Sequence, residues 1–491
     1  MLRSGAFAAG AQVVVSPIAL IALSLLGAPQ FAQAQIAQAQ IAQAQIALAQ
    51  AAVPVRELSA VDAKTSERFG NIFNLRQLAG GKVLVNDGLR RQLVVLDGNL
   101  SHPTVLVDSV TEGGQSYGPR ASPLIPYLAD SSLFVDGQSS SLLVIDPNGK
   151  IAHVMSAPKA GDLRFLAGGT SGIDAQGNLL YRAANMIVRN GPLSGGAGAP
   201  TAPIQPSDSA SIVRANFETR VVDTVGRVKI SSPSRLNMVQ DGNGKPTVRM
   251  TINPLVTVDE WAVLSDGTIA MVRGHDYHVD LIHPDGTLTS TPKLPFDWKR
   301  LTDADKQALI DSAQAAQDKQ AADAKANAAN PNAPKVGGGG DGTGQVEMKM
   351  IISTGSAMGS GGGGGGGMSI SPGGPGGPPG MQSFNTTPTI EFVPLKDIAD
   401  YYPAIRQGAA KADLDGNLWI LPTTSAQSKA GELVYDVMNN KGELFQRVRL
   451  PIGRSIAGFG HSGVVYLMYR DGTAGWALER TKILNNARAT D

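Results

Sequence analysis

Five arginines recur at a similar position relative to predicted turns. Each lies 9 to 13 residues before a turn glycine, or the residue in its place, at positions 81, 132, 177, 416 and 463; the arginines are Arg68, Arg120, Arg164, Arg406 and Arg454. A guanidinium group presents several donors in one plane and binds carboxylates and phosphates well. If the five converge, they predict a site for an anionic ligand or a carboxylate-bearing partner. The alternative is that each pairs with a carboxylate of a neighbouring unit and has a structural role.

Two acidic residues stand in the corresponding stretch before a sixth turn, at Gly267. This unit has no arginine at the shared position and carries Asp259 and Glu260 slightly later. If the arginines converge, these carboxylates are their counter-charges and the acids best placed to line the same site. Neither group contains the pattern of a catalytic motif, so no catalytic residue is assigned.

Three further motifs resemble chemical sites but are better explained as turns or loops. Gly460–Gly463 holds adjacent His and Ser without the strand–turn–helix context of a nucleophile elbow, which favours a hairpin turn. The glycine-rich stretch 359–367 has no strand before it and no helix after it, which excludes a dinucleotide-phosphate loop. Asp276, His278 and Asp280 would share one face of a strand, but a lone hairpin rarely wraps an ion, so a solvated edge is favoured over a metal site.

The elements that must position these residues are short strands joined by Asp-Gly or equivalent turns. The clearest unit is Val258–Gly286, where aliphatic runs alternate with turns at Gly267 and Gly286. Asp-Gly reaches positive φ at low steric cost and joins two strands as a hairpin. Six such units are present, with turn positions at 81, 132, 177, 267, 416 and 463. Repeated small sheets at about 40 to 50 residues predict propeller blades, because one sheet alone cannot bury both its faces.

These six units resemble the blades of six-bladed β-propellers of the TolB-like and NHL-like group, over about residues 55–485. The resemblance is architectural and implies an all-β, six-bladed β-propeller; it brings no catalytic motif. In a propeller, the stretch before each first strand lies at one mouth of the central channel, where the five arginines, Asp259 and Glu260 would meet. Val53–Ala60 is strand-like, and we predict that it closes the ring as the outer strand of the blade containing Tyr466 and Trp476.

The N-terminal residues have the pattern of an export signal. Residues 1–34 look like a signal peptide, with Arg3 ahead of an apolar run and Ala32 and Ala34 in a small-x-small cleavage pattern. Residues 35–52 are a low-complexity spacer of near-identical pentads. The propeller is predicted to span residues 53–490, and no stable membrane span is expected after cleavage, because the apolar run is short and interrupted by proline.

Several insertions are predicted within the propeller. They are a flexible loop at 191–207, a helix at 301–330 with Thr302 and Asp305 in an N-terminal capping arrangement, and a disordered Gly/Pro-rich insertion at 337–380. Strands at Leu236–Val239 and Thr247–Met250 would lengthen blade three or begin blade four. Val346–Ile352 has a strand pattern and is a candidate partner for Thr389–Phe392.

The composition excludes some classes of function. The balance of 42 Lys+Arg against 41 Asp+Glu, a net charge of +1, is unlike that of a dedicated nucleic-acid binder. The chain has no cysteine, which removes disulfides, thiolate metal sites, cysteine nucleophiles and a lipid anchor on cysteine.

The sequence therefore favours an exported, periplasmic or extracellular β-propeller that binds a protein or an anionic small molecule at its channel mouth. No cofactor and no metal ligand are assigned, and the oligomeric state is open. The alternative is a metal-dependent enzyme that resembles propeller lactonases or lyases, which hold a divalent cation such as Ca²⁺ in the channel with carboxylate and amide side chains. Channel-facing carboxylates from at least three blades would favour this alternative, and only Asp259 and Glu260 are candidates in the sequence. A cell-surface adhesin is a third interpretation, which depends on the Gly-rich segment alone.

Overall fold

The computed structural model describes residues 53–484, apart from 111–115, 119–120, 137–140, 167–169, 184–207, 231–233, 241–245, 330–388, 425–430 and 473. The predicted signal peptide, the spacer, the loop at 191–207, the Gly/Pro-rich insertion and the candidate strand Val346–Ile352 lie outside the described residues. Among those described, no helix is long and apolar enough to cross a membrane.

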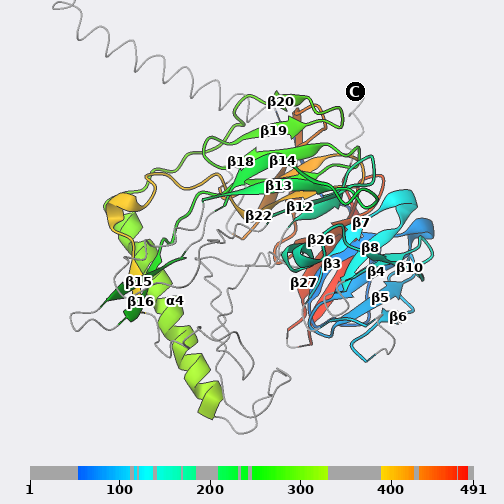
Figure 1. Ribbon diagram of the computed structural model, residues 1–491, viewed down its shortest axis with the longest axis horizontal. Helices are drawn as coiled ribbons and strands as arrows, with labels where there is room; N and C mark the ends of the chain where they lie inside the picture. The colour runs from blue at the N-terminus through cyan, green and yellow to red at the C-terminus, as the bar shows by residue number, and fades with distance from the viewer. Residues whose placement is uncertain are drawn as a thin grey trace, which may run out of the picture. The chain divides into compact units, whose positions relative to one another are not determined.

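Six antiparallel sheets form the blades (Figure 1). In blades 1 to 5 the four blade strands follow one another in chain order, and in blade 6 the fourth position is occupied by β2 from the N-terminal segment. Blade 1 consists of β3 (Ile72–Gln77), β4 (Val83–Asp87), β5 (Gln92–Leu96) and β6 (Thr104–Val107). Blade 2 consists of β7 (Leu124–Pro126), β8 (Ser132–Asp136), β9 (Ser141–Ile145) and β10 (Ile151–Ser156). Blade 3 consists of β11 (Ser171–Ile173), β12 (Leu179–Arg182), β13 (Ser209–Ala215) and β14 (Val222–Lys229).

The second half of the propeller repeats this plan. Blade 4 consists of β17 (Glu260–Val263), β18 (Ile269–Arg273), β19 (His278–Ile282) and β20 (Leu288–Ser290). Blade 5 consists of β22 (Ile405–Ala412), β23 (Leu418–Pro422), β24 (Leu433–Met438) and β25 (Leu444–Leu450). Blade 6 consists of β26 (Ser455–Phe459), β27 (Val464–Arg470), β28 (Trp476–Lys482) and β2 (Ala63–Lys64). The six-bladed β-propeller predicted from the repeats is confirmed.

The hydrophobic core is divided among the gaps between consecutive blades. Six clusters of buried apolar side chains each join two neighbours; for example, Leu84 of blade 1 packs with Phe134 of blade 2. The ring closes in the same way, because Tyr466 of blade 6 packs in one cluster with Val83 of blade 1. Alternation along a strand sends successive side chains to opposite faces, so both faces of every blade are buried without a second layer.

Close packing between the inner strands of neighbouring blades requires glycine at two positions. A Cβ atom at Gly172 of β11 would lie 2.6 Å from the side chain of Val263 on β17. A Cβ atom at Gly458 of β26 would lie 2.7 Å from the side chain of Leu75 on β3. The inner strands of neighbouring blades therefore approach closely around the axis, and a residue on one inner strand can reach the next.

The predicted turn positions are occupied as the Asp-Gly pattern indicates. Gly81, Gly177, Gly267, Gly416 and Gly463 all have positive φ, between +72° and +87°. In blade 2 this role falls to Ala129 and Asp130, which have φ of 51° and 58° although they are not glycines. Gly460–Gly463 is a hairpin turn as predicted: the Gly460 amide donates to the Val464 carbonyl, and the Ser462 and Gly463 amides donate to the Asp415 carboxylate of the neighbouring blade.

Ring closure agrees with the prediction only in part. The first half of Val53–Ala60 lies on blade 5, where β1 (Val55–Arg56) pairs in parallel with β25 at the outer edge. The second half lies beside the end of β28 in blade 6, where Leu58 forms an antiparallel bridge with Ile483 and the Ser59 amide donates to the Lys482 carbonyl. The strand that closes blade 6 is β2, a few residues later, where Ala63 and Lys64 pair with Arg480 and Glu479 of β28. The N-terminal segment thus covers the outer edges of two blades. Protection of an exposed edge was expected, but the pairing of the individual residues differs from the predicted one.

A separate small sheet lies outside the six blades. β15 (Ser234–Gln240) and β16 (Pro246–Ile252) pair as a hairpin, and β21 (Thr389–Phe392) adds in parallel to β16. The prediction that the hairpin extends blade three or begins blade four is therefore wrong, and β21 has β16 as its partner. Nearby, Leu255, Leu301 and Ile398 form a core of their own.

The predicted helix is present as α4 (Asp303–Ala329). Its first turn is capped reciprocally: the Asp305 amide donates to the Thr302 hydroxyl oxygen, while the Thr302 amide donates to the Asp305 carboxylate. Lys306 is buried in this turn and pairs with Asp400 at 2.6 Å. The helix is therefore fixed at its N-terminal end, as expected from its apolar residues Leu309 and Ile310.

Candidate functional site

Two of the five predicted arginines are held by carboxylates. The Arg68 guanidinium lies 2.6 Å from Asp471, which follows β27, and also donates to three nearby backbone carbonyls. Arg454 donates to both oxygens of Glu479 on β28, at 3.1 and 3.3 Å, and its guanidinium lies over the ring of Tyr469. This pairing agrees with the structural alternative for these two arginines.

The other three arginines are distributed differently. Arg406 is exposed on the inner strand β22 and has interactions with other residues. Arg164 is in the short helix α3 (Leu163–Leu166), and its side chain lies outside what the structure describes. Arg120 also lies outside the described residues. The convergence of the five arginines therefore stays a prediction, because the side chains of Arg120 and Arg164 lie outside the described residues.

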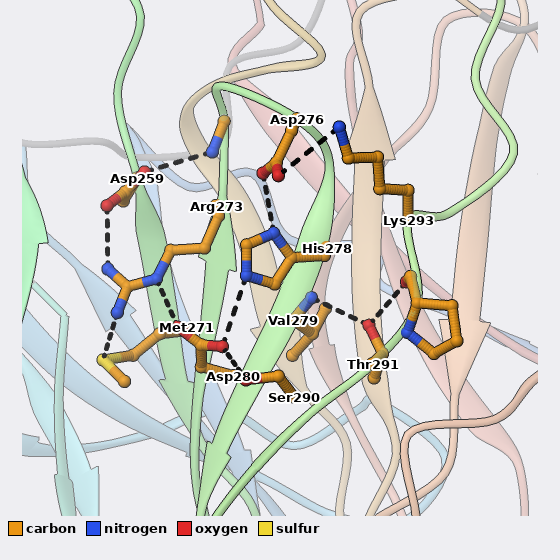
Figure 2. Close-up of polar contacts among 12 residues, drawn as sticks. Asp259, Met271, Arg273, Asp276, His278, Val279, Asp280, Ser290, Thr291 and Lys293 are labelled. Carbon is orange, nitrogen blue, oxygen red and sulfur yellow. Dashed lines mark hydrogen bonds and ion pairs between the residues drawn. The ribbon is translucent and has the colours of Figure 1, made fainter. Parts of the chain in front are cut away.

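Asp259 begins a chain of ion pairs that crosses blade 4. Arg273 donates to Asp259 at 2.9 Å and to Asp280 at 2.7 Å, so the guanidinium bridges the two carboxylates (Figure 2). The Lys229 and Gly274 amides also donate to Asp259. Bonds to Asp280 and Asp259 outweigh the cost of burial and raise the pKa of Arg273. These contacts hold the Asp259 side chain in place beside the start of β17.

The same chain continues through His278. Its Nδ1 lies 2.6 Å from Asp276, and its Nε2 lies 3.3 Å from Asp280, while Lys293 approaches Asp276 from the far side (Figure 2). Asp276, His278 and Asp280 thus share a face, as the sequence predicted. Each of the two carboxylates is already paired with a cation or with the imidazole. No group of three or more His, Asp or Glu side chains within the described ranges is placed to hold a metal ion.

Glu260 is in a different environment from Asp259. It is the first residue of β17, the inner strand of blade 4, and its side chain is buried at 7% relative exposure. Burial raises its pKa to about 7, because a carboxylate loses its hydration there. The opposing influences are a backbone hydrogen bond from Gly408 and the positive charges of Arg182 and Lys411, while the charge of Asp259 adds to the rise.

The three neighbours of Glu260 come from the blades on either side. Arg182 ends β12 of blade 3, and Lys411 and Gly408 belong to β22 of blade 5. Glu260 is opposite Val272, the fourth residue of β18, whereas Lys411 is opposite Trp419, the second residue of β23. Lys411 therefore lies further from the start of its inner strand than Glu260 lies from the start of its own. We call Glu260, Arg182, Lys411 and the Gly408 amide the Glu260 cluster.

A bulge in β22 exposes backbone beside Glu260. The pairing of β22 with β23 shifts between Ile405 and Ala410, so that the residues between them are left out of the ladder. Gly408 has φ of +81° within this bulge, a conformation that glycine adopts without strain. Arg406 and Gly408 are exposed here, whereas Glu260 is buried.

Arg182 and Lys411 keep their charge available for a ligand. Neither side chain has a hydrogen bond or a close ion pair with any residue that the structure describes; both act on Glu260 through their charge. Both are partly buried. Burial lowers the pKa of Lys411, and the charge of Glu260 opposes that shift. Two partly buried cations beside a buried carboxyl group can receive an anionic group.

Sequence reasoning identified Glu260 but missed Arg182 and Lys411. Glu260 stood out because an acid occupies the stretch where other units carry arginine. Arg182 and Lys411 are single basic residues at the end of one strand and within another, at 78 and 151 positions from Glu260 in the sequence. The available signal was a lysine inside the otherwise small and apolar run Ala409–Ala412, which is unusual for a buried strand.

Comparisons with known proteins do not assign a family. No protein-family model matches the chain, and no curated protein matches it. Similar solved structures include a streptogramin B lyase, 9% identical over 86% of each chain with a TM-score of 0.30. They also include virginiamycin B lyase from Staphylococcus aureus (9% identical, 86% of this chain and 98% of that chain, TM-score 0.33) and a PQQ-bound aldose sugar dehydrogenase from Streptomyces coelicolor (10% identical, 88% and 100%, TM-score 0.32). At these TM-scores the likeness carries no argument, and the blade count depends on the sheets and cores described above.

Proposed function

We propose that this chain is an exported binding protein whose propeller receives an anionic group at the Glu260 cluster. The observation that carries the proposal is the pair of partly buried cations, Arg182 and Lys411, without a hydrogen-bonding or ion-pair partner in the described part of the chain. Export is supported by the signal-like pattern of residues 1–34. The ligand is a small oxyanion-bearing molecule or a carboxylate or phosphate group presented by a partner protein.

The position of the cluster supports this function. Residues from three consecutive blades contribute to it, and the gaps between these blades are filled by buried apolar side chains. A site on well-packed elements loses little free energy to reorganisation of the protein when a ligand binds. Asp259 is already neutralised by Arg273, so it offers no competing partner for the cluster cations.

Replacing the cations should weaken anion binding. Arg182→Gln and Lys411→Met remove one charge each with little change in side-chain length, and each should lower the affinity for sulfate by roughly ten- to a hundredfold, since a hydrogen bond to a charged group contributes about 1.5–3 kcal/mol. Calorimetric titration of sulfate at pH 6 measures the effect. The matched control is Arg220→Gln, which removes a charge at the β13–β14 turn, where Arg220 bonds to Ser156 and Ala157. If all three variants bind like the original chain, the cluster is not the site.

A second candidate function is general acid–base catalysis by the side chains of the Glu260 cluster. One observation favours it. A carboxyl group with a pKa of about 7 beside a lysine whose pKa is lowered is a combination suited to general acid–base catalysis. If the chain is such an enzyme, turnover of γ- and δ-lactones should depend on a group titrating near pH 7 and should fall at least roughly tenfold in Glu260→Gln, since proton transfer contributes about that much or more. Turnover that is absent, or unchanged in Glu260→Gln, counts against this function.

A further inference from the structure

A hollow of about 480 Å³ lies where three segments of the chain come together. One wall belongs to blade 3, at Asp208 and Lys229, and a second belongs to the connection between β16 and β17, at residues 253 and 255–257. The third wall is formed by residues 396–400, which begin in the 3₁₀ helix η4 (Leu395–Asp397). Cavities that hold small molecules have volumes of roughly 300–1,000 Å³, so this hollow is large enough for a ligand. None of its lining residues belongs to the Glu260 cluster.

Hydrogen bonds and apolar packing fix the walls of the hollow. The Ile230 amide donates to the Asp208 carbonyl at 2.8 Å, which holds the wall in blade 3. In the connection, the Leu255 amide donates to the Asn253 side chain at 2.9 Å. Leu255 and Ile398 are 6% and 2% exposed and pack in one core, so the second and third walls are joined. A hollow whose walls are already packed needs little reorganisation when a ligand enters it.

The lining of the hollow carries charges of both signs that do not pair with one another. Its charged residues are Asp208, Asp397, Asp400, Lys229 and Lys396. Asp400 is held at 2.6 Å by Lys306. The side chains of the other four are exposed and have no hydrogen bond or ion pair with any residue that the structure describes. Two carboxylates and two ammonium groups therefore stand apart around one hollow instead of neutralising one another by contact.

We propose that this hollow binds a small zwitterion of the amino-acid class. Asp208 and Asp397 receive its ammonium group, and Lys229 and Lys396 receive its carboxylate. A molecule with both charges meets both kinds of group at once, through charge-assisted hydrogen bonds, which are stronger than neutral ones. An anion alone leaves the two carboxylates as like charges beside it, and a cation alone leaves the two lysines so.

The apolar part of the lining indicates what else the ligand carries. Ile230 and Val256 line the hollow and are half-buried, so they offer apolar surface to a ligand that covers them. An amino acid with an aliphatic side chain combines such a group with both charges, which makes leucine the first probe. The proposal is independent of the proposed function, because Arg182 and Lys411 are not among the lining residues.

Calorimetric titration of the full chain with leucine and two analogues tests the ligand class. N-acetyl-leucine lacks the ammonium group and leucinamide lacks the carboxylate, so each should bind roughly ten- to a hundredfold more weakly than leucine. The other amino acids are titrated in the same way. If none of the twenty binds with a dissociation constant below about 10 mM, the hollow is not a site for this class and the proposal is overturned. Equal affinities for leucine and both analogues would overturn it as well, because the charges would then have no part in binding.

Two variants assign the charges of the ligand to the walls. Asp397→Asn should weaken leucine binding roughly tenfold without weakening that of N-acetyl-leucine, which lacks the group that Asp397 receives. Lys229→Gln should weaken leucine binding to a similar extent without weakening that of leucinamide. The matched control is Asp223→Asn, which removes an exposed charge of β14 outside the hollow and should bind leucine like the original chain. Unchanged leucine affinity in both test variants would show that the four charges are merely hydrated, and would overturn the proposal.

Discussion

Replacing Asp436 by alanine should lower the free energy of unfolding by about 3–5 kcal/mol, as expected when one partner of a buried ion pair is removed. The Asp436 carboxylate accepts a hydrogen bond from the Tyr277 hydroxyl at 2.6 Å and one from Arg447 Nε at 2.7 Å. All three side chains are buried, with relative exposures of 2%, 0% and 5% for Asp436, Tyr277 and Arg447. Alanine would leave a buried hydroxyl and a buried guanidinium without this carboxylate, which is why the loss should be large.

The position of this group adds to its effect. Asp436 and Arg447 belong to β24 and β25 of blade 5, and Tyr277 lies between β18 and β19 of blade 4. Burial is the main cause of the raised pKa of Tyr277, and the charge of Asp436 adds to it, so this hydroxyl remains a donor. The hydrogen bond between Tyr277 and Asp436 therefore joins two blades through side chains that are buried.

Chemical denaturation of the folded chain measures the loss, with Asp471→Ala as the matched control. Asp471 pairs with Arg68 at 2.6 Å, but its side chain is about half exposed, so its loss should cost at most about 1 kcal/mol. A triple variant, Tyr277→Phe with Asp436→Leu and Arg447→Met, should regain most of the stability, because apolar side chains of similar volume need no partner. Equal losses for Asp436→Ala and Asp471→Ala would contradict the argument.

The blades could be predicted from the sequence because their signals are local. A turn glycine with positive φ and the aliphatic residues that follow it lie within about ten residues of one another, and both were readable at Gly267 and at Gly416. The number of blades followed from counting such units. The hairpin at β15 and β16 has the same local pattern, yet it forms a separate sheet, because its membership depends on β21, more than a hundred residues away.

The candidate site was only partly predictable because its contacts are not local. Glu260 was identified from its place in the repeat, but the residues that set its properties lie on other blades. The arginine pattern placed Arg68 and Arg454 near the starts of first strands correctly in sequence, yet their carboxylate partners, Asp471 and Glu479, are set by how the blades meet. Closure shows the same limit, since strand character at Val55 did not reveal which blade edge it would cover.

Glu260→Gln should stabilise the folded chain at alkaline pH and leave it nearly unchanged at pH 4.5. In the unfolded chain the carboxyl group of Glu260 has an ordinary pKa of 4.5, whereas in the folded chain its pKa is raised to about 7. Between these values the folded chain holds a proton that the unfolded chain has released. The stability contributed by the protonated group is therefore complete below pH 4.5 and is lost as the pH rises to about 7.

The expected loss sets the size of the effect. A difference of one pKa unit corresponds to about 1.4 kcal/mol, so the whole shift costs the folded chain up to about 3 kcal/mol above pH 7. Glutamine does not titrate and keeps an oxygen that can accept the Gly408 hydrogen bond, so the variant should gain about 1–3 kcal/mol over the original chain at pH 8. Denaturation of both proteins at pH 4.5 and pH 8, with Glu443→Gln as an exposed control, measures the difference. A loss of stability in Glu260→Gln at pH 8 would show that the surroundings of Glu260 favour the carboxylate rather than the acid, and would contradict the argument.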